Sequence, residues 1–139
     1  MLRNRHILSR GPSAAMAIMA LLWLMPGVIQ AAEPLQRLDI ASSDGAVHAF
    51  QVELARNPEE REKGLMFRRY MPPDRGMLFD FGKPEPATMW MENTYLSLDM
   101  VFIRADGTIA RIETNTEPMS RRVIAAGEPV LGVLELNSG

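Results

Sequence analysis

The chain has 139 residues, of which 47% are hydrophobic, and its formal net charge is −2. It contains no cysteine, which excludes disulfide bonds, thiol catalysis, thiolate metal sites and covalent haem attachment. Its 17 acidic residues outnumber its 15 basic residues, and this balance disfavours a nucleic-acid partner, which would need a basic face.

The first 32 residues are typical of a secretory signal peptide. They open with three basic residues, Arg3, Arg5 and Arg10. An uncharged apolar run over 14–25 follows, and Ala31 and Ala32 offer a cleavage site. We therefore expect a periplasmic or secreted protein. The one membrane contact that we expect is through an uncleaved signal segment, since residues 14–32 are just long enough to span a bilayer.

Cleavage would leave residues 33–139 as one β-rich domain, which is room for a single core. After residue 32, 12 basic and 17 acidic side chains give a net charge of about −5. Because the domain has no cysteine, its stability must come from packing.

Two strand-like segments open this domain, at 35–40 and 48–54. The turn residues Ser43-Asp44-Gly45 lie between them and predict a β-hairpin. In the second segment His48 shares a face with the apolar residues at 50, 52 and 54. This position favours a histidine at the strand end, on the core side, over a metal ligand.

A short helix is predicted over 58–63. Asn57 is a favourable N-cap, Pro58 suits the first helical position, and the acidic residues that follow match the helix dipole. Lys63 and Gly64 are typical of a helix end.

Five further segments have the composition of short strands, and they lie at 77–81, 88–91, 98–103, 108–113 and 130–136. Ala105-Asp106-Gly107 gives a strong hairpin signal between two of them. Seven short strands with one short helix predict a mainly β fold, organised as a single β-sandwich or barrel-like domain.

Five motifs carry a resemblance to a known family. In order, they are REKGLMFR (61–68), GMLF (76–79), WMENT (90–94), LDMVFI (98–103) and DGTI (106–109). This series resembles domain-of-unknown-function family 192, a group of small, often exported bacterial and archaeal proteins. The resemblance runs from about Leu38 to Gly139 and implies a jelly-roll-like fold with no established activity. Family members often have lysine in place of Glu92 and usually continue for a further helix and strand, so we expect this chain to lack those elements.

Six residues are the candidate ligand-binding residues: Arg61, Arg68, Trp90, Asn93, Thr94 and Asp99. Alternation places Asp99 on a partly apolar face, where a carboxylate needs a partner, and the two arginines are the natural candidates. Two interpretations stay open. One is a structural ion pair between helix and sheet, and the other is a small polar pocket with Trp90 as its aromatic wall.

The preferred function is a binding module of the cell envelope for a small molecule or an envelope protein, without a cofactor or metal, as a monomer or weak dimer. Among alternatives, an enzyme would have to be a carboxylate-dependent hydrolase that uses residues such as Asp80, Glu92 and Asp99. Cu(I) binding through Met89 and Met91 is less favoured, since methionine is also an ordinary core residue.

Overall fold

The computed structural model describes residues 34–139, so the predicted signal peptide lies outside the described residues. The described part consists of β1 (Gln36–Ala41), β2 (Val47–Ala55), α1 (Pro58–Lys63), β3 (Arg75–Met89), β4 (Leu98–Ile103), β5 (Ile109–Glu113) and β6 (Ile124–Asn137). Over this range no helix combines the length and the apolar character that crossing a membrane requires. The prediction of a mainly β fold with one short helix is confirmed.

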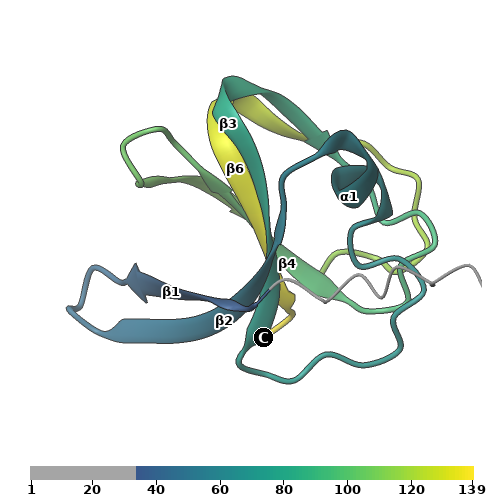
Figure 1. The fold of residues 1–139 in the computed structure, drawn as a ribbon, viewed down its shortest axis with the longest axis horizontal. Coiled ribbons are helices and arrows are strands. Elements are labelled where there is room, and N and C mark those ends of the chain that lie inside the picture. Colours follow the sequence, from purple (N-terminus) through teal and green to yellow (C-terminus); the bar gives the residue numbers. More distant parts are fainter. Residues whose placement is uncertain (1–33) are drawn as a thin grey trace, which may run out of the picture. The chain divides into compact units, whose positions relative to one another are not determined.

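All six strands belong to one sheet, in the order β1-β2-β3-β6-β4-β5. The sheet is open, with β1 and β5 at its edges, and is not closed into a barrel. Strands β2 and β3 pair in parallel, and the other neighbours pair antiparallel. A parallel pair needs a crossover connection, and here that connection carries α1. Figure 1 shows α1 beside β3, away from the β1-β2 hairpin.

The prediction of seven strands was wrong, because the segment at 77–81 and the first two residues of the segment at 88–91 belong to the single long strand β3, which ends at Met89. The pairing of β3 with β6 shifts register between Asp80 and Glu85 and again between Pro86 and Thr88. Gly82 has a positive φ of 72° in this region. Glycine and proline at such irregularities resemble turn residues in the sequence, although the strand continues through them.

The predicted helix is confirmed, and local interactions explain it. The Asn57 side chain accepts a hydrogen bond from the Glu60 backbone N–H (2.9 Å), and the Glu60 carboxylate accepts one from the Asn57 N–H (3.2 Å). This reciprocal capping box stabilises the first turn. Gly64 ends the helix with a φ of 45°, and a Cβ there would lie 3.0 Å from the ring of Phe79. The glycine therefore lets the helix end approach β3 closely.

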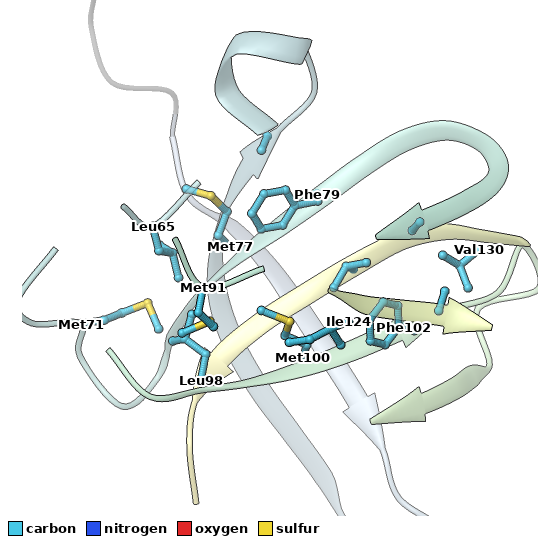
Figure 2. Packing of buried hydrophobic residues seen from close by; sticks show 14 residues of the cluster. Leu65, Met71, Met77, Phe79, Met91, Leu98, Met100, Phe102, Ile124 and Val130 are labelled. Atoms are coloured by element: carbon cyan, nitrogen blue, oxygen red, sulfur yellow. The ribbon is translucent and has the colours of Figure 1, made fainter. Parts of the chain in front are cut away.

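The buried side chains form two clusters, one on each face of the sheet. The larger cluster lies on the face that carries α1. In Figure 2, Met71, Met77, Met91 and Leu98 gather toward one end of it, and Phe102, Ile124 and Val130 toward the other. The smaller cluster is centred on Val52, Val101 and Leu134. His48 does share the face of the smaller cluster, as alternation predicted, but its side chain is exposed at the strand end.

Candidate functional site

A cavity of about 370 Å³ lies between α1 and β3. Helix α1 and the turn that follows it form one wall, and β3 from Phe79 to Met89 forms the other. Trp90, Thr94 and Glu135 complete the lining. The cavity therefore exists because the β2–β3 crossover holds a helix against the sheet.

Glu135 is the most unusual residue of this cavity. It lies on β6, faces Met77 of β3 and Met100 of β4 in the sheet register, and is only 4% exposed. Within residues 34–139 its carboxyl group has no hydrogen bond or ion pair. Because burial disfavours the charged form, the pKa of Glu135 is raised to about 8. Glu135 is therefore a buried carboxylic acid in the wall of the cavity.

Apolar and aromatic side chains share the walls of the cavity with polar ones. Leu65 and Phe79 are buried, Phe81 is half-buried, and Trp90 is 42% exposed. The Thr94 side chain is buried and donates a hydrogen bond to the Glu92 carbonyl oxygen (3.2 Å). Apolar walls with a few polar groups are typical of sites for small organic molecules.

Four charged residues also line the cavity, and they all belong to α1 or β3: Arg61, Glu62, Lys63 and Glu85. Arg61 donates hydrogen bonds to the carbonyl oxygens of Arg56 (2.7 Å) and Asp80 (3.0 Å), and its guanidinium lies 5.7 Å from the ring centroid of Phe81. These contacts tie α1 to β3. Two cations and two carboxylates balance one another around the cavity, which leaves Glu135 as its distinguishing group.

Of the six predicted site residues, the structure brings Arg61, Trp90 and Thr94 together in this cavity. Arg68 instead forms a bidentate ion pair with Glu53 of β2, at 2.5 and 2.6 Å. That pair lowers the pKa of Glu53 and raises the pKa of Arg68, in each case mainly through their shared hydrogen bonds. Asn93 supports the cavity wall, since its side chain contacts the Met66 sulfur at 3.9 Å.

The predicted pairing of Asp99 with Arg61 or Arg68 is wrong. The Asp99 carboxylate accepts hydrogen bonds from the backbone N–H groups of Asn115 (2.8 Å) and Gly139 (3.4 Å). Asp99 shares its face with Val101, on the opposite side of the sheet from α1. The sequence assigned Asp99 to the correct face of the sheet, but Arg61 and Arg68 lie on the opposite face.

The residues named for catalysis or copper have structural contacts. Asp80 accepts a hydrogen bond from the Gly82 N–H (2.8 Å), and Glu92 pairs with Arg121 (2.7 Å). Like Asp99, neither lines the cavity. Met91 is 1% exposed in the core, whereas Met89 is half-buried and lines the cavity. No group of three or more His, Cys, Asp or Glu side chains in the described range could hold a metal ion.

The sequence prediction missed Glu135, although a signal was present. Glu135 stands between Leu134 and Leu136 in a strand whose two faces are both apolar. An acidic residue in such a strand must be buried on one face or the other. Whether a buried position in this strand lines a cavity depends on where the β2–β3 crossover places α1. The alternation of residues in the strand carries no information about that.

The fold and the cavity define a small, mainly β domain with a ligand-sized pocket that a buried acid lines. The chain belongs to the DUF192 family, described as "Uncharacterized ACR", whose model matches residues 39–139. A search of curated proteins found no match.

Two solved structures share the fold. A proposed transcription regulator from Sinorhizobium meliloti is 53% identical, with a TM-score of 0.74 over 76% of this chain and 81% of that one. A protein of unknown function from Novosphingobium aromaticivorans is 37% identical, with a TM-score of 0.72 over 76% of this chain and 74% of that one.

Proposed function

We propose that this protein is a small-ligand binding module of the cell envelope and that the cavity between α1 and β3 is its binding site. The observation that carries the proposal is the unpartnered carboxyl group of Glu135, a buried residue that lines the cavity. Such a group costs folding free energy, and proteins retain perturbed acids most often at functional sites. A cavity of about 370 Å³ is the size of a small organic ligand.

Three of the residues predicted from the sequence would contact the ligand together with Glu135: Arg61, Trp90 and Thr94. Arg68 and Asn93 support this site through their contacts with Glu53 and Met66. Asp99 has no part in it, because it lies on the other face of the sheet.

The hydrolase alternative is weaker. An acid with a pKa near neutrality could transfer a proton, but hydrolysis needs a second group placed against it. The strand neighbours of Glu135 on this face are Met77 and Met100, which supply none. A role in transcription, which is named for the Sinorhizobium protein, is also less favoured for this chain. Acidic residues outnumber basic ones by 17 to 12 after residue 32, whereas nucleic-acid binding relies on a basic face.

A thermal-shift screen of small metabolites with the purified protein tests the proposed site. A ligand at 100 times its Kd should stabilise the fold by about 2.7 kcal/mol, which is roughly 10 °C in Tm for a domain of this size. Thr88→Trp, at an exposed position in the cavity lining, should fill the opening and abolish the shift. Thr114→Trp is the matched control, because Thr114 is exposed and lies outside the cavity. A shift that persists in Thr88→Trp would refute this site.

The envelope location is part of the same proposal, and it rests on the basic start and apolar run of residues 1–32. Mass spectrometry of protein from a periplasmic fraction should show a chain that begins near Ala32 or Glu33. An intact Met1 in the membrane fraction would contradict cleavage.

A further inference from the structure

We propose that the cavity binds an organic cation, a protonated amine with an apolar body, whose ammonium group pairs with the Glu135 carboxylate. This inference rests on the proposed function and names the ligand class of the same site. Three features of the cavity support it: the hydrogen-bonding character of its buried polar groups, its aromatic side chains, and the charge of Glu135.

Two buried side chains, Glu135 and Thr94, offer polar atoms to the cavity. Both would accept a hydrogen bond from a ligand. An ionised carboxylate accepts only, and that of Glu135 has no donor within residues 34–139. The Thr94 hydroxyl uses its proton on the Glu92 carbonyl oxygen, so its remaining capacity is as an acceptor. An ammonium group has three donors and no acceptor, which complements this pair. At these two buried groups a ligand carboxylate or phosphate would instead meet acceptors.

The walls suit the rest of such a ligand. Phe79 and Trp90 contribute aromatic rings, and Leu65 adds apolar surface. The ring of Phe81 already contacts the Arg61 guanidinium. Aromatic faces attract cations, and the attraction strengthens where water is excluded. An alkyl or aryl body can therefore pack on these walls while its ammonium group reaches Glu135.

The charged groups around the cavity do not oppose a cation. Arg61 and Lys63 are balanced by Glu62 and Glu85, and the strand neighbours of Glu135, Met77 and Met100, are uncharged. The cavity is thus neutral while Glu135 is protonated and carries one negative charge once it ionises. A bound cation would neutralise that charge, and a charge-assisted hydrogen bond is roughly twice as strong as a neutral one.

This pairing would couple binding to pH. Below about pH 8 the free protein holds a proton on Glu135, and a cation that pairs with the ionised form must release it. The apparent Kd should therefore fall about tenfold for each pH unit between 6 and 8 and level off above pH 8. A ligand that binds the protonated acid would show the opposite trend.

The test is calorimetric titration of the full protein with matched probes. Hexylamine and 2-phenylethylamine are compared with the alcohol and the carboxylate that have the same apolar body, at pH 6, 7, 8 and 9. We expect an amine to bind with the pH dependence described and with release of up to one proton below pH 8. We expect Glu135→Gln to weaken amine binding at least 100-fold at pH 8. Glu117→Gln, an exposed carboxylate outside the cavity, is the control and should bind as the unaltered protein does.

The outcomes separate this inference from the proposed function. If an alcohol or a carboxylate binds and Thr88→Trp blocks it while no amine binds, the cation inference is overturned and the binding site stands. Amine binding that does not depend on pH or on Glu135 also overturns the inference. If no probe binds and the metabolite screen finds no ligand that Thr88→Trp blocks, both proposals fail.

Discussion

Glu135→Gln is expected to make the protein more stable than the unaltered chain above about pH 8. In the native state the pKa of Glu135 is about 8, against 4.5 for an unperturbed glutamate. Between these values the native state holds a proton that the unfolded chain has released, so the free energy of unfolding falls as pH rises. Above pH 8 the full loss is reached, about 5 kcal/mol at most. Glutamine cannot ionise, so the variant avoids this loss.

The comparison of the two proteins at several pH values isolates this effect. Urea unfolding at pH 5, 7 and 9 should give similar stabilities at pH 5 and a widening advantage for Glu135→Gln at higher pH. All other titrating groups are common to both proteins, so their contributions cancel in the difference. Glu117→Gln should follow the unaltered protein throughout. Parallel curves for Glu135→Gln and the unaltered protein would mean that Glu135 ionises freely in the native state.

The same substitution connects stability with function. If Glu135 serves a ligand, Glu135→Gln gains stability and loses binding, which is the trade-off expected of a site that the fold keeps at its own cost. If the residue only packs, the variant gains stability and loses nothing. Measuring both properties on one variant therefore tests whether the buried acid is functional.

The parts of this fold that local interactions determine were predicted well from the sequence. The helix over 58–63 is held by its own capping residues, and Asn57 and Gly64 mark both of its ends. The β1-β2 hairpin likewise follows from its turn and from alternation. The sequence predictions that were wrong concern contacts between segments that are distant in the chain.

In the candidate site, too, local features could be predicted from the sequence and contacts between distant segments could not. Alternation assigned Asp99 to the correct face, but only the crossover decides that α1 covers the other face. Arg68 therefore meets Glu53, which is 15 residues earlier in the chain, and never Asp99. Glu135 lies 74 positions beyond Arg61, yet the same cavity includes both. No local pattern around Arg61 or Glu135 indicates that the two residues line one cavity.

Phe102→Ala is expected to be the most damaging of the simple core truncations. Phe102 is fully buried in β4 within the larger cluster, and the Arg111 guanidinium lies 5.3 Å from its ring centroid. Replacing a buried phenylalanine by alanine removes its transfer free energy and leaves a cavity, together costing about 3–5 kcal/mol. Since small domains have total stabilities of about 5–15 kcal/mol, a large part of the stability would be lost.

Phe67→Ala makes the same chemical change at a side chain that is 61% exposed, so it is the matched control and should alter the free energy of unfolding by less than about 0.5 kcal/mol. Phe102 lies with Ile124 and Val130 at the end of the cluster away from Met71, Met77 and Met91 (Figure 2). It does not line the cavity. Phe102→Ala should therefore shift the urea midpoint strongly at every pH while leaving the pH dependence due to Glu135 in place. Loss of that pH dependence in Phe102→Ala would show instead that the two ends of the cluster pack as one unit and that the environment of Glu135 depends on both.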